Sequence, residues 1–520
     1  MDKSGVGKVW LVGAGPGAPE LITVRGAKVL SQAQVVIYDH LVSDELLNLA
    51  PSDAELIYAG KRGGGQLALT QQEINRLILE HARAGKRVVR LKGGDPLIFG
   101  RGGEEMLALA QAGVEFEVVP GVTSPIAAAA FAGIPVTHRD IGSFVAFVTG
   151  HEGEAKPSNA GVPWRELAAA ASHGGTLVLL MATARMEQVM NNLVEFGLAA
   201  STPAAIVQSA TTAAQKTVLA TVGTLHRAAT EAGIKAPTVI IVGQCVAMAE
   251  RLSWFEERPL FGRRILVTRA RDKAAVLADR LVELGAQVTS LPTIEIAEPD
   301  SYAALDDALS RLGEFDWVVF TSPVGVERFM ARLSLLNRDV RELAKARIAA
   351  VGPATAERLK AYGLRTDVMP AEFHSEALAH AFAERDVRGQ RFLLPRAQVA
   401  GQMLPKLLLE RGAKSVVQVA AYKTQKPAAR GVARIGEAID AGELDLVVFT
   451  SPSTATNLIE MVGPKALALD AAAIGPVTAA ACRKLGFNVV LEAREHTIPG
   501  LTRAIQDYFE RLKGKSSSQS

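Results

Sequence analysis

The sequence has 520 residues, of which 48 % are hydrophobic and 21 % are charged. Because a single hydrophobic core stops growing at roughly 250 to 300 residues, this length predicts at least two domains. The formal net charge of +3 is nearly balanced, so it indicates neither a nucleic-acid-binding nor a membrane-binding protein. No apolar run approaches the roughly 20 residues that a membrane helix requires.

Cysteine usage and the chain ends add further expectations. Cys245 and Cys482 are far apart and form neither a disulfide framework nor a pair with metal-ligand spacing. We therefore expect no metal site and a reducing, cytoplasmic location. Because residues 1–8 are short and polar, we expect no targeting signal at the N-terminus. Residues 513–520 are small and polar, and we expect them to form a disordered tail.

Short β-branched runs bounded by glycine recur along the first half and predict strands. They are VWLVG (9–13), VVIYD (35–39), VVRLKGGD (88–95), VAFVTG (145–150), TLVLLM (176–181) and VIIVG (239–243). Helical patterns over 71–84 and 103–112 lie between these strands. This alternation predicts an α/β fold with a largely parallel sheet.

The second half begins with a new strand, ILVTR (265–269), so we place the domain boundary near residue 258. The expected domains are 1–257 and 258–512. An internal duplication marks the second domain: four segments match four others at an offset of about 120 to 130 residues. The paired segments are GRRILVTRA (262–270) with GQRFLLPRA (389–397), ELGAQV with ERGAKS, FDWVVFTSP (315–323) with LDLVVFTSP (444–452), and AVGPATA (350–356) with AIGPVTA (473–479). A period this long predicts two related α/β lobes with a ligand cleft between them.

The glycine-rich loop VGAGPG (12–17) follows the first strand, where small residues let backbone amides approach a ligand. Alone it is equally compatible with an ordinary turn. A dinucleotide-dependent oxidoreductase would also use such a loop, although Pro16 and Pro19 argue against that fingerprint. The run LKGGDPLIFGRGGEE (91–105) is more specific, because it sets Asp95 beside backbone that can approach an adenosyl ribose or amino-acid group.

Taken in order, six segments of the first half resemble the precorrin/tetrapyrrole methyltransferase family, and uroporphyrinogen-III C-methyltransferase most closely. They are VGAGPG, YDHLV (38–42), AGKR (59–62), KGGDPLIFGRGGEE, VVPGVTS (118–124) and AGIPVTHRD (132–140). The resemblance covers roughly residues 8–256. It implies a two-lobed fold with S-adenosylmethionine between the lobes and a homodimer formed through this domain. The implied reaction adds two methyl groups to uroporphyrinogen III, giving precorrin-2.

The same resemblance implies roles for individual residues. Asp39 is the candidate general base that removes a proton from the methylated macrocycle, and its alternative role is to cap amides at the strand end. Lys61 matches a proposed proton donor and, with Arg62, would also bind substrate carboxylates. The implied cofactor contacts are Pro16, Gly93, Gly94, Asp95, Ile98, Thr123, Ser124, Met181, Ala210 and Thr238.

Several positions depart from the family pattern. Ala18 stands where aspartate is usual, MAT (181–183) replaces Met-Gly-Leu, Ala210 replaces glycine, and GGGQLAL (63–69) lacks a familiar histidine. A second hypothesis therefore stays open, in which only the other half is active and this half is a retuned methyltransferase or a tetrapyrrole-binding module. Siroheme synthase, a bifunctional relative, adds a dehydrogenase and ferrochelatase module that is not seen here. Siroheme and cobalamin both remain open as end products.

The second half resembles uroporphyrinogen-III synthase over residues 262–510. The resemblance rests on the order of segments that include FTSPVGVERF (320–329), LLPRA (393–397), VAAYKT (419–424), FTSPSTATNL (449–458) and IGPVTAAACRKLG (474–486). It implies a duplicated, two-lobed fold. The implied reaction closes hydroxymethylbilane to uroporphyrinogen III with the last pyrrole inverted, and this product is the substrate implied for the first half.

Tyr422 matches the family's candidate for assisting departure of the substrate hydroxyl, and its alternative is a tyrosine packed at a strand end. Arg269, Arg396 and Lys423 are candidate partners for substrate carboxylates. The hydroxyl groups expected to bind the same carboxylate arms are those of Thr321, Ser322, Thr450, Ser451 and Ser453.

Overall fold

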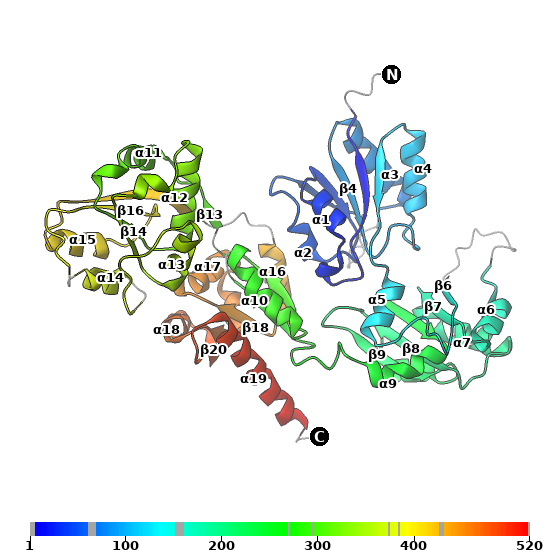
Figure 1. The fold of residues 1–520 in the computed structure, drawn as a ribbon. Helices are drawn as coiled ribbons and strands as arrows, with labels where there is room; N and C mark the ends of the chain where they lie inside the picture. The colour runs from blue at the N-terminus through cyan, green and yellow to red at the C-terminus, as the bar shows by residue number, and fades with distance from the viewer. Residues whose placement is uncertain are drawn as a thin grey trace. The chain divides into compact units, whose positions relative to one another are not determined.

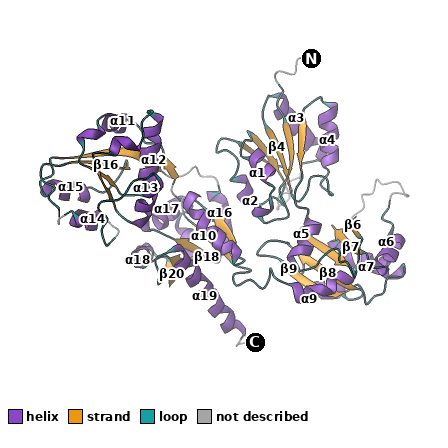
Figure 2. Cartoon of the chain, viewed as in Figure 1, coloured by secondary structure: helices purple, strands orange, loops and turns teal. Residues whose placement is uncertain are grey.

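The computed structural model describes residues 6–60, 69–150, 161–268, 271–293, 295–372, 375–382, 385–425 and 431–517. Strands and helices alternate along the chain (Figure 1), and within each region strands lie between helices (Figure 2). The chain forms two compact units. Met1–Thr268, Lys273–Leu291 and Ala428–Ser520 make the first, and Arg269–Asp272 with Pro292–Pro427 makes the second. The boundary near residue 258 stays a prediction.

The first sheet is entirely parallel. Its strands, from one edge to the other, are β3 (Glu55–Tyr58), β2 (Val35–Tyr38), β4 (Val88–Lys92), β1 (Val9–Gly13) and β5 (Phe116–Val119). One face packs against α1 (Val24–Leu30) and α2 (Asp44–Leu47), the other against α3 (Gln71–Arg83) and α4 (Gly102–Gln111). Helices on both faces explain why β1 and β4 are buried along their whole length.

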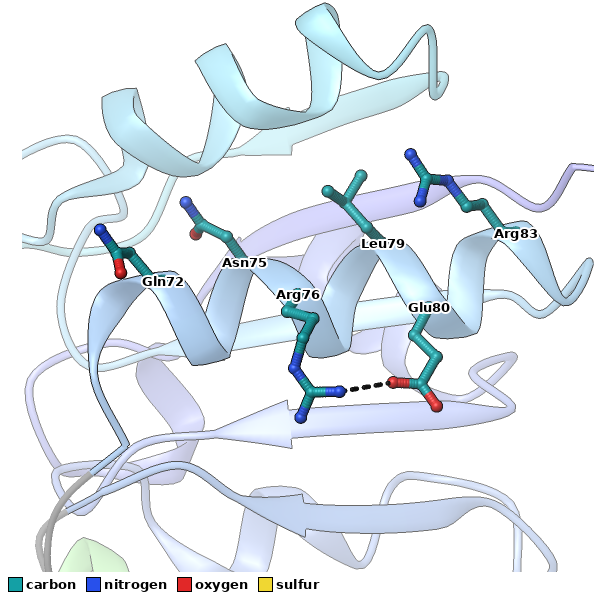
Figure 3. Close-up of a pocket in the computed structure, with 6 residues that line it drawn as sticks. All are labelled: Gln72, Asn75, Arg76, Leu79, Glu80 and Arg83. Carbon is teal, nitrogen blue, oxygen red and sulfur yellow. Dashed lines mark hydrogen bonds and ion pairs between the residues drawn. The ribbon is translucent and has the colours of Figure 1, made fainter.

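Helix α3 illustrates how local sequence sets an element. Thr70 and Glu73 form a capping box at its start, and Ile74, Ile78 and Ala82 repeat every four residues on its buried face. The opposite face lines a shallow hollow on the surface (Figure 3), where Arg76 and Glu80 form an ion pair of 3.4 Å. The residues lining this hollow are Gln72, Asn75, Arg76, Leu79, Glu80 and Arg83. They all come from one helix, so the hollow is a surface feature of α3.

The second sheet is mixed. Its order is β6 (Val145–Thr149), β7 (Thr176–Leu180), β10 (Thr238–Val242), β8 (Pro203–Gln208) and β9 (Lys216–Thr221), and only β6 and β7 are parallel. The prediction of largely parallel sheets is wrong for this one. Antiparallel neighbours need only a short connection, as between β8 and β9, and apolar runs do not encode strand direction. Its helices are α5 (Ser124–Phe131), α6 (Trp164–Ser172), α7 (Met186–Glu195), α8 (Leu225–Glu231) and α9 (Ala249–Leu252).

The third sheet lies in the first unit and the fourth in the second. The third has the order β12 (Gln287–Ser290), β11 (Arg264–Val267), β18 (Leu446–Phe449), β19 (Asp470–Ala473) and β20 (Asn488–Glu492). The fourth has the order β13 (Glu295–Ala297), β17 (Ser415–Gln425), β16 (Arg391–Ala397), β14 (Trp317–Phe320) and β15 (Arg347–Ala350).

These two sheets confirm the duplicated fold. The order β12, β11, β18, β19 in one corresponds strand for strand to β17, β16, β14, β15 in the other, as the repeated segments require. Helices cover both faces of each sheet. They are α10 (Arg271–Glu283), α16 (Val432–Asp440), α17 (Pro452–Val462), α18 (Pro476–Leu485) and α19 (Ile498–Ser517) for the third sheet, and α11 (Ala303–Ser310), α12 (Pro323–Leu335), α13 (Pro353–Ala361), α14 (Ser375–Ala381) and α15 (Met403–Glu410) for the fourth.

Two expectations on the chain's periphery can be compared with the structure. Helix α19 continues to Ser517, so residues 513–517 are helical rather than part of a disordered tail, because the helical segment propagates beyond its packed turns. Residues 518–520 lie outside the described ranges. Among the helices that the structure describes, none is long and apolar enough to cross a bilayer.

Candidate functional site

The loop after β1 pairs with the loop after β4. The Gly15 amide donates to the Gly94 carbonyl over 3.2 Å, and the Gly94 amide donates to the Gly15 carbonyl over 2.6 Å. Gly94 has φ of +67°, and a Cβ on the adjacent Gly121 would lie 2.3 Å from the Gly94 carbonyl oxygen. Backbone therefore approaches backbone too closely for larger residues. The packing brings together three segments that were predicted to bind the cofactor.

Asp95 connects two of these segments. Its Oδ1 accepts a hydrogen bond from the Leu97 amide over 2.8 Å, and its Oδ2 accepts one from the Gly121 amide over 3.0 Å. Each carboxylate oxygen can still accept a second bond from a ligand. Asp95 thus shapes the loop that leads to Ile98, while Gly121 opens the turn that carries Thr123 and Ser124 into α5.

Three further predicted cofactor residues converge in the second sheet. Met181 follows the last residue of β7, and Thr238 begins β10, whose next residue pairs with Leu180. Thr238 also pairs with Gln208 at the end of β8, two residues before Ala210. The Met181 side chain is half-exposed, with φ of +54°, although a methionine that ends an apolar strand more often packs in the core. Met181, Thr238 and Ala210 therefore lie close together, at or just beyond the neighbouring ends of β7, β10 and β8.

The glycine-rich loop of the first sheet contacts the turn that follows β8 in the second sheet. A Cβ on Gly17 would lie 3.0 Å from Thr211 Oγ1 and 3.2 Å from the Ala210 carbonyl oxygen. The Ala18 amide donates to Thr211 Oγ1 over 2.9 Å. Beyond this loop the chain forms a short 3-10 turn, Pro19–Leu21, before α1. A dinucleotide fingerprint needs a helix that opens directly at its glycines, so the geometry argues against an oxidoreductase.

Asp39, which follows β2, lies in a buried charge network. Arg90 Nη2 donates to Asp39 Oδ1 over 2.6 Å, and Arg90 Nε donates to Glu105 Oε1 over 3.1 Å. Lys92 Nζ and Gln71 Nε2 donate to the same Glu105 oxygen, over 3.0 and 3.3 Å. Arg90, Lys92 and Glu105 are each at least 97 % buried, whereas the Asp39 side chain is 30 % exposed. The buried residues of this network therefore hold the partly exposed carboxylate of Asp39 in place.

The electrostatics of this network follow from burial. Desolvation, reinforced by the positive charge of Arg90, lowers the pKa of the Lys92 ammonium below its ordinary value, while Glu105 opposes the shift. Sequence reasoning missed Arg90, Lys92 and Glu105. A usable signal was present: charged residues alternate with apolar ones in VVRLK, so two cations occupy a buried face and require an acidic partner. Lys61 and Arg62 lie outside the described residues.

In the second unit, Tyr422 and Ser322 lie together. The two hydroxyl oxygens are 3.0 Å apart, and Ser322 Oγ also accepts a hydrogen bond from the Gly325 amide as the N-cap of α12. The Tyr422 ring is buried and packs in the core cluster with Phe329. Its hydroxyl is therefore held by a residue predicted from the same family resemblance. Thr321 precedes Ser322 at the end of β14 and is partly exposed.

Arg396, near the end of β16, is a buried cation with weak pairing. It is 94 % buried, and its Nη1 donates to Gln418 Oε1 over 3.3 Å, while Nε has no hydrogen-bond partner among the described residues. Burial lowers the pKa of Arg396 below its usual range, and Tyr422 opposes the shift. An anionic ligand would compensate such a charge. Lys423, by contrast, forms an ion pair of 2.7 Å with Asp300.

The other predicted hydroxyl turn lies in the first unit, after β18. Ser451 Oγ and Ser453 Oγ are 3.1 Å apart, and Thr454 Oγ1 donates to the Ser451 carbonyl over 2.7 Å. Ser453 is exposed, and Thr450 and Ser451 are partly exposed, so their hydroxyls are open to a ligand. Arg269 lies outside the described residues. Within the described ranges, no group of three or more His, Cys, Asp or Glu residues could hold a metal ion.

Comparison with known proteins follows the division of the chain. The family model of the tetrapyrrole (corrin/porphyrin) methylases matches residues 8–226, and that of uroporphyrinogen-III synthase HemD matches residues 275–503. Over 496 residues the chain is 39 % identical to the porphyrin biosynthesis protein HemD of Ruminiclostridium josui. The match covers 95 % of this chain and 97 % of that protein.

Two further matches concern the first half. The chain is 47 % identical over 258 residues to siroheme synthase of Stutzerimonas stutzeri, covering 50 % of this chain and 54 % of that protein. It thus spans about half the length of that relative. A crystal structure of uroporphyrin-III C-methyl transferase from Thermus thermophilus complexed with S-adenyl homocysteine is 40 % identical, with a TM-score of 0.39, and covers 46 % of this chain and 93 % of that one.

Proposed function

We propose two successive reactions for this chain, which belongs to the family of porphyrin biosynthesis proteins that carry a tetrapyrrole methylase region followed by a uroporphyrinogen-III synthase region. The second half converts hydroxymethylbilane to uroporphyrinogen III. The first half methylates that product twice with S-adenosylmethionine, giving precorrin-2. The observation that supports methylation most directly is the close contact of Gly17, in the glycine-rich loop, with Ala210, in the turn after β8. This contact joins the two groups of residues that are predicted to bind the cofactor.

The chain's residues fit the cofactor. Close backbone packing at Gly15, Gly94 and Gly121 fixes the two loops against each other, and the carbonyl oxygens of Gly15 and Gly94 can each still accept a second hydrogen bond from a ligand. Pro16, Gly93, Gly94, Asp95, Ile98, Thr123, Ser124, Met181, Ala210 and Thr238 would hold it. When bound, S-adenosylmethionine supplies an electrophilic methyl group. The residues have to align this group with an electron-rich pyrrole carbon, and such positioning accounts for much of the expected rate enhancement.

Asp39 is the proposed general base for the proton that leaves the methylated macrocycle. Arg90 fixes the orientation of its carboxylate through a 2.6 Å hydrogen bond, and the exposed part of the side chain can meet a substrate. We assign Lys61 and Arg62 to the substrate's acetate and propionate arms, and Lys61 also to proton donation, on the family resemblance alone. The charge of both side chains suits carboxylate ligands.

In the synthase region we propose that Tyr422 assists departure of the substrate hydroxyl. Its phenol lies 3.0 Å from Ser322 Oγ, so its orientation is set before the substrate binds. Arg396 would bind a carboxylate arm, as would Arg269, Thr321, Ser322, Thr450, Ser451 and Ser453. The bilane loses its hydroxyl readily, so holding the chain in the geometry for inverted closure is the main task.

An Asp39→Asn variant tests the methylation half. Asparagine keeps the size and can still bond to Arg90, but it cannot take up a proton. We expect methylation of uroporphyrinogen III to fall by about 100-fold or more, as is usual for loss of a general base. Synthase activity in the same preparation should be unchanged. Full methylation by this variant would assign Asp39 to a structural role.

A second candidate function is tetrapyrrole binding without methyl transfer. It is favoured by Ala210, which stands in the turn beside the cofactor loop where the family pattern has glycine. Wild-type protein that binds uroporphyrinogen III but never methylates it would support this function.

We further propose a homodimer formed through the methylase region. The free thiols of Cys245 and Cys482 fit a reducing cytoplasm.

A further inference from the structure

The turn after β8 holds an unusual backbone. Ser209 and Thr211 have φ of +44° and +70°, a region that residues other than glycine rarely adopt and β-branched residues such as threonine least of all. Thr211 is 96 % buried, and its Oγ1 accepts the hydrogen bond from the Ala18 amide in the opposite lobe of the methylase region. Such strain persists where the surroundings over-determine the conformation, and it is concentrated at functional sites.

A chain of hydrogen bonds that begins at the backbone amide of Thr211 holds this residue in place. Its amide donates to Gln215 Oε1 over 2.8 Å, and Gln215 is likewise 96 % buried. Gln215 Nε2 donates to the Phe131 carbonyl over 3.2 Å and to Glu256 Oε1 over 3.0 Å. Thr217 Oγ1 donates to the same Glu256 oxygen over 2.6 Å. A buried amide and a carboxylate thus fix the strained turn whose hydroxyl reaches the glycine-rich loop.

The contact between the glycine-rich loop and the turn after β8 leaves no room for a side chain at Gly17. Gly17 lies so close to the turn that a Cβ would be 2.9 Å from Thr212 Cγ2. Ala18 stands where the family resemblance expects aspartate, and its backbone amide makes the cross-lobe hydrogen bond to the Thr211 hydroxyl. Loss of that hydroxyl would leave the Ala18 amide without its acceptor and allow the loop to move relative to Ala210.

We propose that Thr211, held by Gln215, is a positioning residue for S-adenosylmethionine. It sets the distance between the glycine-rich loop and the Ala210 turn, and so sets the width of the cofactor cradle. The inference rests on the proposed methyltransferase function and deepens it. It predicts that the hydroxyl acts on cofactor affinity, and that its loss leaves the affinity for the tetrapyrrole unchanged.

The test uses the full chain with Thr211→Val, which keeps the branched shape and removes the hydroxyl. Titration calorimetry with S-adenosylhomocysteine should show affinity about tenfold weaker than in wild type, the scale of one lost hydrogen bond at a buried site. Thr211→Ser should restore affinity to within about threefold, because it retains the hydroxyl. In methylation assays the KM for S-adenosylmethionine should rise while the KM for uroporphyrinogen III stays constant.

Thr212→Val is the matched control. Its hydroxyl donates to the Ser209 carbonyl over 2.8 Å and accepts from the Ala214 amide over 3.2 Å, so both hydrogen bonds stay within the turn. Valine keeps the methyl group that lies next to Gly17. Equal losses of cofactor affinity in Thr211→Val and Thr212→Val would overturn the proposal, as would unchanged affinity in Thr211→Val. Wild-type protein that binds no S-adenosylhomocysteine would instead contradict the proposed methylation.

A second variant covers the case in which Thr211→Val fails to fold, judged by loss of synthase activity and of the thermal transition. Gln215→Met removes the amide that holds Thr211 without touching Ala18. Weaker binding of S-adenosylhomocysteine with normal synthase activity would support the proposal. Unchanged binding in Gln215→Met would contradict it.

Discussion

Arg90 joins two carboxylates that lie far apart in the sequence. Its Nη2 donates to Asp39 Oδ1 over 2.6 Å and its Nε donates to Glu105 Oε1 over 3.1 Å. A guanidinium can make both bonds at once because its donors form a rigid planar fork. The buried Glu105 thereby determines how the proposed base, Asp39, is oriented toward the substrate.

Arg90→Lys should separate charge from geometry. A lysine ammonium lacks the planar fork, so it would not hold both carboxylates in the present arrangement. We expect kcat for methylation to fall by about tenfold or more, as follows from misplacement of a catalytic group, while S-adenosylhomocysteine affinity stays constant. Steady-state kinetics and calorimetry measure the two quantities. A kcat equal to that of wild type would show that orientation by Arg90 is unimportant.

Glu105→Gln and Lys92→Met should differ in stability. Glu105→Gln leaves two buried cations with one acidic partner and should lower the free energy of unfolding by about 3 to 5 kcal/mol. Lys92→Met leaves Arg90 paired with Glu105 and should cost less. Chemical denaturation of both variants measures the difference. A larger loss in Lys92→Met would contradict this account.

The same lysine predicts a pH dependence. Its pKa is lowered in the folded protein, so the unfolded chain binds the proton more tightly and the cost of burying the charge disappears as pH rises. Wild type should therefore gain stability relative to Lys92→Met as pH increases through the window that ends at the ordinary value of 10.5. Denaturation of both proteins at several pH values tests the sign. A gap that is independent of pH would contradict it.

Tyr422→Phe should reduce formation of the type III isomer. Loss of the phenol slows assisted hydroxyl departure, and unassisted closure to the type I isomer then competes. We expect the enzymatic rate to fall by about 100-fold, as for loss of a general acid. Chromatographic separation of the isomers measures it. Tyr362, at the end of α13, lies beside the Arg358 guanidinium in the same unit, and Tyr362→Phe is the matched control. An equal effect of both changes would contradict a specific role for Tyr422.

Arg396→Met should separate binding from stability. If the guanidinium binds a substrate carboxylate, its removal should raise the KM for hydroxymethylbilane by about tenfold or more. The melting temperature should stay constant or rise, because a buried cation without a carboxylate partner disfavours folding. A lower melting temperature with unchanged KM would instead make Arg396 a structural residue.

Much of the fold could be predicted from the sequence, because its elements follow local patterns. Apolar runs such as VWLVG and VIIVG became buried strands, and the repeat around FTSP became two sheets with matching strand order. Strand direction in the second sheet could not be predicted, since an apolar run packs equally well either way round. The helical residues up to Ser517 were missed because their composition is polar.

The sequence indicated some parts of the candidate site and not others. Glycine motifs indicated the loops that we propose to bind the cofactor, because close backbone approach leaves a visible sequence signature. Thr211 and Gln215 carry no such signature: threonine and glutamine are ordinary residues, and only the strained turn and the contact with Ala18 give them meaning. Likewise, the sequence does not distinguish Glu105 from other acidic residues. Its role follows from the fold, in which it accepts hydrogen bonds from two buried cations, Arg90 and Lys92.

The most direct test of the two-step function uses the full chain with hydroxymethylbilane under anaerobic conditions, with and without S-adenosylmethionine. Isomers and C-methylated products are resolved in both reactions. We predict uroporphyrinogen III without the cofactor and doubly methylated precorrin-2 with it. Type I product alone would contradict the synthase function, and type III product that is never methylated would contradict the methyltransferase function.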